Sequence, residues 1–311
     1  KKFLAKNNQI EIFNFLEGSL SKLILLGLGE TKQLSINHFR KAAAEGVREC
    51  EGNTGNLGII FPWNLLDVKT STQAVGEAIC LSIFNDNRFK SDKNTTKYPK
   101  TCELIGLPTI GITTLKDIDP ICSGVEFARE LVAAPPNYLT PEALAKEAKN
   151  LAKDYGLELR ILEENDCSKL GMGAFLAVAK GSDLKPKFIH LTYRSTLPIR
   201  KTFAFVGKGL TFDSGGYNLK VGASQIELMK FDMGGSAAVL GAAKSIGQIK
   251  PEGIEIHFII ASCENMINGK AVRPGDIVTA SNGKTIEINN TDAEGRLTLT
   301  DALVYATELK P

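Results

Sequence analysis

Short strand-like runs alternate with helical stretches along almost the whole of this 311-residue chain, and this alternation constrains the fold more than any other feature. Residues 23–29 form an apolar run that ends in glycines, and a helical pattern follows from Ile36 to about Cys50. Alternating strands and helices are typical of α/β domains. The pattern predicts further strands at 56–61, 104–112, 157–162, 187–193, 202–206 and 254–261, and helices at 71–84, 121–134, 141–155, 234–249 and 294–309.

The chain is long enough for two domains. Pro135-Pro136 ends the helix predicted over 121–134, because proline and the residue before it disfavour helix. We predict a smaller N-terminal α/β domain over residues 1–118, a linker helix over 119–137, and a larger α/β domain with a mixed, largely parallel sheet over 138–311. Near the end of the chain, Asn282-Gly283 predicts a hairpin with a type I′ turn.

Composition narrows the function classes. The formal net charge of +2 gives no general affinity for nucleic acid, and no apolar run reaches the roughly 18 residues of a membrane-spanning helix. Six scattered cysteines predict reduced thiols and a cytoplasmic location. The sequence has only three histidines, and His257 lies in a strand-like run, where we interpret it as a core residue. Any metal would therefore be held by carboxylates, with an amine as a further ligand.

Three glycine-rich stretches, 207–216, 230–235 and 290–297, concentrate charged side chains. In open α/β sheets, ligands bind at the carboxyl ends of the strands. Lys208 follows the predicted strand 202–206, Asp213 lies in the predicted loop after it, and Asp292 follows a strand predicted to end near residue 288. We therefore expect the candidate residues at one edge of the sheet; they are Lys208, Asp213, Lys220, Asp232, Asp292, Glu294 and Arg296.

Taken singly, these residues have ordinary explanations. Asp292 and Glu294 suit a helix N-terminus, Asp213 suits a turn, and the cations suit a solvated surface. Four clustered carboxylates, however, cannot all ionise without compensation. Two divalent metals, roughly 3.5–4 Å apart and bridged by carboxylates, would supply it, and a lysine could join them only as the neutral amine. The sequence thus predicts a two-metal hydrolytic site.

Residues 206–216 and 290–297 resemble the signatures of the leucyl (cytosol) aminopeptidase family, and the second string matches at every position. The resemblance extends over the chain from about residue 120, with further matches at 129–132, 135–137 and 273–276. The first domain is similar to the family's macro-like N-terminal domain in its α/β character only.

This resemblance implies a metal-dependent aminopeptidase that releases leucine-like N-terminal residues from peptides with a metal-activated water. Zn²⁺ and Mn²⁺ are the expected ions, with Mg²⁺ as a further candidate. It also implies a homohexamer. The implied roles are as follows: Lys208, Asp213, Asp232 and Glu294 bind one metal; Asp213, Asp292 and Glu294 bind the other; Lys220 acts as the electrophile; and Arg296 holds a bicarbonate as general base.

The family's chain normally continues beyond this point, so we expect the catalytic domain to be truncated at its C-terminus. Three alternatives stay open. One is a DNA-binding role, for which residues 90–100 offer several lysines but the net charge of +2 offers little support. Another is a catalytically silent assembly fragment. The third is a two-metal phosphoesterase that uses the same carboxylates.

Overall fold

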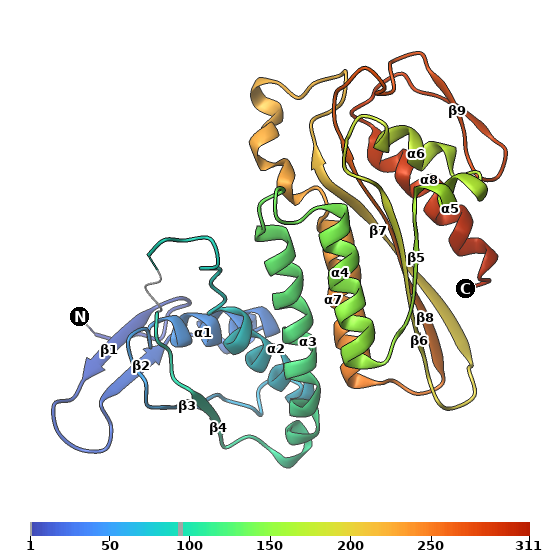
Figure 1. Cartoon of the computed structure of the whole chain (residues 1–311). Coiled ribbons are helices and arrows are strands. Elements are labelled where there is room, and N and C mark those ends of the chain that lie inside the picture. Colours follow the sequence, from blue (N-terminus) through green and yellow to red (C-terminus); the bar gives the residue numbers. More distant parts are fainter. Residues whose placement is uncertain (1, 93–95) are drawn as a thin grey trace. The chain divides into compact units, whose positions relative to one another are not determined.

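The computed structural model describes residues 2–92 and 96–311. The chain divides into two compact units, Lys1–Cys122 and Ser123–Pro311, which can be followed by colour in Figure 1. The division falls inside helix α3 (Thr109–Ala133). This helix runs through Pro120, whereas the sequence predicted a helix beginning just after that proline.

The first unit is a small α/β unit. Its strands pair as an antiparallel hairpin and as a parallel pair, and two helices pack together over a core that contains Phe39, Phe61, Trp63 and Val75. The expected smaller N-terminal α/β domain is thus present. Its elements are β1 (Ile10–Asn14), β2 (Lys22–Leu26), η1 (Thr31–Gln33), α1 (Ile36–Arg48), β3 (Asn56–Ile60), α2 (Val68–Leu81) and β4 (Thr101–Ile105).

Several predicted limits in this unit are wrong. The strand predicted over 104–112 ends at Ile105, because Gly106 takes a left-handed φ of 71° and α3 begins at Thr109. Helix α2 begins before the predicted residue 71, since Asp67 caps it by accepting a hydrogen bond from the Thr70 N–H. Strand β1 was not predicted. Part of the loop predicted over 85–100, residues 93–95, lies outside the described residues.

The second unit is built on a four-stranded sheet with the order β5 (Glu158–Leu162), β6 (Lys187–Arg194), β8 (Ile254–Asn265) and β7 (Lys201–Asp213). The predicted mixed sheet is confirmed. The expectation that it is largely parallel is wrong, because within residues 123–311 only β7 and β8 pair in parallel. Residues 195–200 connect β6 to β7 and are too few for the helical crossover that would make these two strands run the same way.

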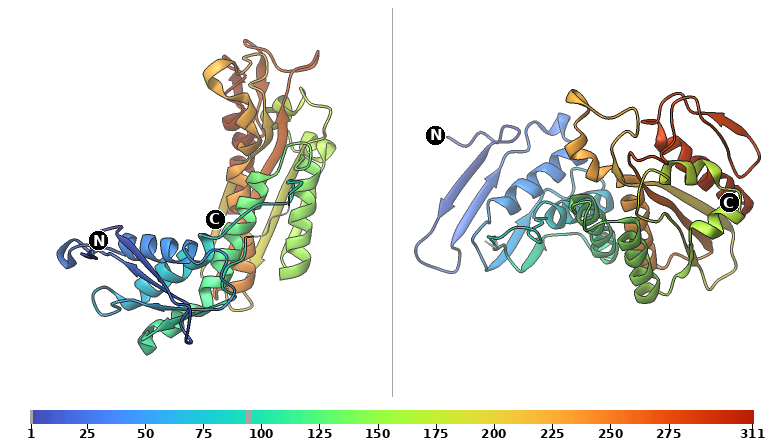
Figure 2. Two further views of the ribbon diagram at one scale, coloured as in Figure 1. Left: turned by 90° about the vertical axis from the view of Figure 1, so that its left-hand side faces the viewer. Right: turned by 45° about the horizontal axis from the view of Figure 1, so that its top comes forward.

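Helices cover both faces of this sheet, as Figure 1 and the two further views in Figure 2 show. Alternate residues of β8 point to opposite faces: Phe258 and Ile260 belong to the core under α4 (Pro141–Tyr155) and α7 (Gly234–Ile249). Ile259 and Ala261 belong to the core under α6 (Gly173–Ala179) and α8 (Glu294–Glu308). The remaining short helices are α5 (Glu164–Lys169), η2 (Gly222–Ser224) and η3 (Ile226–Phe231).

The predicted hairpin near the end of the chain is present as β9 (Ile277–Thr279) and β10 (Thr285–Glu287). Its predicted type I′ turn is wrong, because Gly283 takes a φ of 79° while Asn282 does not take a positive φ. The Gly283 N–H donates to Ala280 O and the Ala280 N–H donates to Lys284 O, which is typical of a three-residue loop with a glycine bulge. The hairpin is separate from the four-stranded sheet.

Two further observations concern the chain as described. No helix within residues 2–92 and 96–311 combines the length and the apolar character needed to cross a membrane. The six cysteines are free thiols, as predicted.

Candidate metal centre

The 13-residue strand β7 carries two of the candidate residues. Lys208 lies within this strand rather than after it, and Asp213 is its last residue rather than a loop residue, so both predicted placements are wrong. Strand β7 is longer than its sequence predicts because it stays paired with β8 beyond the apolar run. A register shift between Leu210 and Phe212 brings Asp213 opposite Asn265 at the end of β8.

Glycines bring the segment around Asp232 close to Lys208. A Cβ atom on Gly207 would lie 2.7 Å from the Gly235 carbonyl oxygen, and one on Gly235 would lie 2.9 Å from the Lys208 backbone nitrogen. Strand β7 and the start of α7 therefore meet backbone against backbone. Asp232, which lies between η3 and α7, is held so that its Oδ2 is 2.9 Å from Lys208 Nζ.

Asp292 lies in the turn just before α8, and Glu294 belongs to the helix itself. Glu294 is the first residue of this helix and is only 2% exposed. Asp292 follows strand β10, as predicted, and this strand belongs to the separate β9–β10 hairpin rather than to the four-stranded sheet. The next residue of the helix, Gly295, packs directly against Lys208: a Cβ atom there would lie 2.8 Å from the Lys208 side chain.

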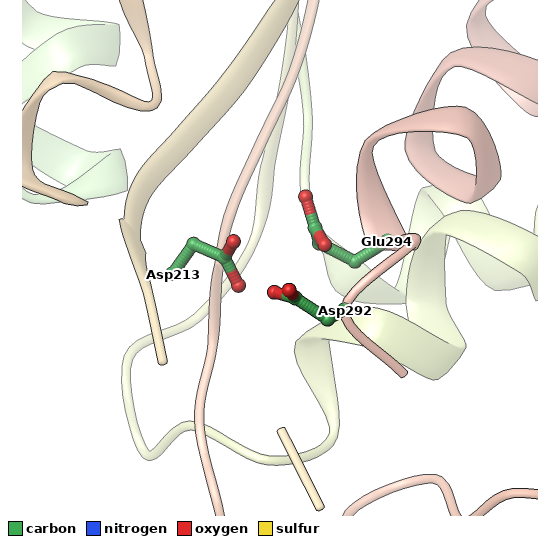
Figure 3. A group of neighbouring side chains, drawn as sticks. All are labelled: Asp213, Asp292 and Glu294. Atoms are coloured by element: carbon green, nitrogen blue, oxygen red, sulfur yellow. The ribbon is translucent and has the colours of Figure 1, made fainter. Parts of the chain in front are cut away.

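Figure 3 shows the carboxylates of Asp213, Asp292 and Glu294 pointing toward one another from the end of β7, from the turn before α8 and from the first residue of α8. One oxygen atom of each lies within 4.8 Å of the others. Two lysines join this cluster to its neighbours. Lys208 Nζ lies 2.7 Å from Glu294 Oε1, and Lys220 Nζ lies 2.9 Å from Asp213 Oδ2 and also contacts Asp292 Oδ1.

The structure thus joins all of the predicted site residues except Arg296 into one network. Arg296 lies in the first turn of α8 with its side chain exposed. Within residues 2–92 and 96–311, its guanidinium forms no ion pair with a carboxylate. It remains a free cation two residues beyond Glu294.

The electrostatics of the cluster reflect crowded carboxylates. Burial, with the nearby charges of Asp213 and Glu294, raises the pKa of Asp232 to about 6, against the opposing effect of Lys208. Burial lowers the pKa of Lys208, but its hydrogen bonds to Asp232 and Glu294 outweigh this and leave the pKa above its ordinary value. The pKa of Lys220 is also raised. Burial lowers it, but the hydrogen bonds to Asp292 and Asp213 outweigh the effect of burial.

One buried oxygen atom indicates whether the site can accommodate a cation. Among the described residues, Glu294 Oε2 is buried and accepts no hydrogen bond. A buried carboxylate oxygen without a donor is costly, and a divalent cation would satisfy it. The donor set of carboxylate oxygens with one amine suits Zn²⁺, Mn²⁺ or Mg²⁺. The residues present therefore fit a metal centre.

The residues that hold the candidate ligands in place were not predicted from the sequence. The amide of Asn265 donates to both Asp213 Oδ1 and the Thr291 carbonyl, and Thr291 and Asn218 exchange hydrogen bonds. A polar residue ending a buried strand-like run was the available signal for Asn265. Asp301 of α8, fully buried, accepts from the Phe175 N–H at 2.8 Å and from the Ser281 N–H at 2.7 Å.

The predicted core role of His257 is confirmed. His257 is buried in β8, and its Nδ1 lies 3.0 Å from Nε2 of His190 on β6. His190 Nδ1 lies 3.0 Å from the hydroxyl of Tyr305 on α8. Burial, together with the charges of His257 and Arg160, lowers the pKa of His190 to about 4. These imidazoles are core groups with hydrogen-bond partners of their own.

Sequence comparison bears on the class of this centre. The profile described as "Cytosol aminopeptidase family, catalytic domain" matches residues 126–311, and the one described as "Cytosol aminopeptidase family, N-terminal domain" matches residues 1–93. A Prochlorococcus marinus (strain MIT 9211) protein named "Probable cytosol aminopeptidase" is 58% identical over 311 residues, which are all of this chain and 63% of the relative. A Synechococcus sp. (strain CC9311) protein of the same name is 55% identical over 312 residues, with the same two coverages.

An α/β unit with a carboxylate-rich centre at the end of its sheet places the chain in the class of candidate metal-binding proteins. Within it, the chain belongs to the cytosol aminopeptidase family. The chain spans 63% of the length of these two curated relatives.

Proposed function

We propose that this chain carries the catalytic site of a metal-dependent aminopeptidase, a hydrolase that releases N-terminal residues from peptides. The convergence of the Asp213, Asp292 and Glu294 carboxylates is the observation that carries the proposal. The buried Glu294 Oε2, which accepts no hydrogen bond from the described residues, supports it. The name "Probable cytosol aminopeptidase" that its relatives bear supports it.

In this proposal Lys208, Asp213, Asp232 and Glu294 hold one divalent ion, and Asp213, Asp292 and Glu294 hold a second. When bound, such ions polarise a carbonyl and lower the pKa of a water to near neutrality. Lys208 can serve as a ligand only as the neutral amine. The proton that Asp232 and Glu294 now stabilise on Lys208 would therefore leave when the site is loaded.

Lys220 and Arg296 would act on the substrate side. Lys220 is a cation held between Asp213 and Asp292, and once released from them its N–H groups can donate to the oxygen on which negative charge develops. Arg296 has an exposed guanidinium with no carboxylate partner in the described chain. That free cation suits bicarbonate, which would take the proton of the attacking water as general base.

The finer parts of the proposal rest on the family rather than on the geometry. They are a preference for leucine-like N-terminal residues, a homohexameric assembly and a cytoplasmic location.

A metal-depletion experiment tests the proposal. The chain would be stripped with a chelator, reloaded with Mn²⁺ or Zn²⁺, and assayed for hydrolysis of leucine p-nitroanilide and for bound metal. We expect turnover that returns with metal and is abolished in Asp292→Ala, while Asp154→Ala, an exposed change on α4, behaves as wild type. A folded wild-type chain that binds no metal stoichiometrically would refute the proposal.

A further inference from the structure

Asn265 ends β8 at the point where the candidate centre begins. It is 2% exposed and pairs with Asp213 across the parallel β7–β8 ladder. Its carbonyl oxygen accepts hydrogen bonds from the Ser214 N–H at 2.9 Å and from the Ser214 hydroxyl at 2.8 Å. The backbone of Asn265 is therefore anchored to the residue that follows β7.

The side-chain amide of Asn265 connects two stretches that are far apart in the sequence. Its Nδ2 donates to Asp213 Oδ1 at 2.8 Å and to the Thr291 carbonyl oxygen at 3.0 Å. Thr291 immediately precedes Asp292. One buried amide thus joins the strand that carries Asp213 to the peptide that carries Asp292.

The same amide decides which oxygen of Asp213 faces the centre. Asp213 Oδ1 accepts two N–H groups, from Asn265 and from the Gly215 backbone at 2.9 Å. The other oxygen, Oδ2, is left for the charged interior of the site, where it meets Lys220 at 2.9 Å. Two donors on one oxygen hold the carboxylate against rotation about its last bond.

We propose that Asn265 is a positioning residue of the metal centre, which aims Asp213 Oδ2 and sets its distance from Asp292. The inference rests on the proposed function, since it concerns the ligands of that centre. An amide is required at this position because both partners are acceptors. A carboxylate would set oxygen against oxygen, and an apolar side chain would leave Asp213 Oδ1 and the Thr291 carbonyl short of a donor.

The test is calorimetric titration of the chelator-stripped full chain with Mn²⁺, comparing wild type with Asn265→Asp and Asn265→Ala. Loss of groups that orient metal ligands weakens metal binding by about 10–100-fold, and we expect a loss of that size in both variants. The matched control is Ser182→Ala. Its hydroxyl donates to Glu264, the residue next to Asn265, at 2.6 Å, and it should leave the affinity unchanged.

Affinity is measured well below the melting temperature of each variant, because a purely structural role would lower that temperature and leave the affinity of the folded chain intact. Wild-type affinity in both folded variants would overturn this inference alone. A wild-type chain that binds no Mn²⁺ would overturn the proposed function and this inference with it.

If neither variant folds, the side-chain amide protons of Asn265 in the wild-type chain decide by nuclear magnetic resonance. The measurement uses the stripped chain and the chain loaded with Zn²⁺, which is diamagnetic. Protection of these protons from exchange with solvent in both samples supports the positioning role. Rapid exchange in the loaded chain overturns it.

Discussion

The ammonium of Lys220 lies 2.9 Å from Oδ2 of Asp213, a carboxylate that is 2% exposed. A cation of the protein itself thus lies against a candidate metal ligand. The same ammonium contacts Asp292, so the two carboxylates share it. In the proposed centre, a metal would compete with this lysine for the two carboxylates, so we expect the stability of the chelator-stripped chain to depend on the lysine.

Lys220→Met is expected to destabilise the stripped chain by about 3 kcal/mol, because removing one partner leaves a buried charge uncompensated. Added Mn²⁺ should restore more stability to this variant than to wild type, since the ion replaces the missing charge. Urea unfolding with and without Mn²⁺ measures both effects. Lys185→Met, which breaks the exposed pair with Glu164, should cost under about 1 kcal/mol; equal losses in the two variants would contradict the prediction.

Gly295→Ala is expected to weaken metal binding by at least about tenfold, in the range found when groups around metal ligands are disturbed. The new methyl would lie 2.8 Å from the Lys208 side chain and would push its amine away from Asp232 and Glu294. Stability should fall little, because alanine favours helix over glycine by about 1 kcal/mol. Calorimetric titration with Mn²⁺ measures the affinity, and Gly269→Ala, which meets open space, is the control. Unchanged binding in Gly295→Ala would show that Lys208 is not a ligand held in place by this contact.

The buried His190 is expected to make the stripped chain less stable as the pH falls from about 6.5 to about 4. Its pKa is lowered to about 4 in the folded chain from an ordinary 6.5, so the unfolded chain binds more protons across that window and gains free energy there. Burial is the main cause. The groups that face His190 are His257 on β8, Tyr305 on α8 and Arg160 on β5, with Thr192 on its own strand.

Urea unfolding of wild type and His190→Gln at pH 7, 5.5 and 4.5 tests this. The carboxylates contribute equally to both proteins, so the difference between the two slopes isolates the histidine and should reach on the order of 2 kcal/mol. Parallel curves for wild type and His190→Gln would contradict the prediction.

Asp301→Asn is expected to lower the free energy of unfolding by about 1–3 kcal/mol, the cost of leaving a buried backbone donor unsatisfied. One carboxylate oxygen would become an NH₂ group facing the N–H of Phe175 or Ser281. Thr300→Ala on the same helix removes an exposed bond to the Arg296 carbonyl and should change stability by under about 0.5 kcal/mol. Thermal unfolding of both variants gives the comparison, and a wild-type midpoint for Asp301→Asn would refute it.

Sequence patterns predicted the elements whose limits are set locally. Helix α4 has its Thr140 cap, Pro141 at the first position and Gly156 in the left-handed region at its end, and all of these signals lie within the helix and its flanks. Sequence patterns did not predict the limits of elements that depend on contacts with distant parts of the chain. The length of β7 depends on pairing with β8, so no local signal placed Asp213 at the end of a strand.

The candidate site shows the same division. Glycine-rich stretches that carry carboxylates near the expected ends of strands predicted which carboxylates gather. Which lysine pairs with which carboxylates depends on three segments that meet in space. Lys208 pairs with Asp232 and Glu294, and Lys220 pairs with Asp213 and Asp292. The bridging amide of Asn265 also depends on contacts in space, because its position follows from a register shift in the ladder.

The backbone contact between Gly207 and Gly235 also limits how this protein can change over evolutionary time. The separation of Lys208 from Asp232 depends on the absence of a Cβ atom at these two glycines, because a side chain at either position would meet the main chain of the other segment. A gradual increase in side-chain size is therefore not possible at either of these two positions. We therefore expect the spacing of Lys208 and Asp232 to be inherited unchanged, because neither glycine can be exchanged without moving the main chain it meets.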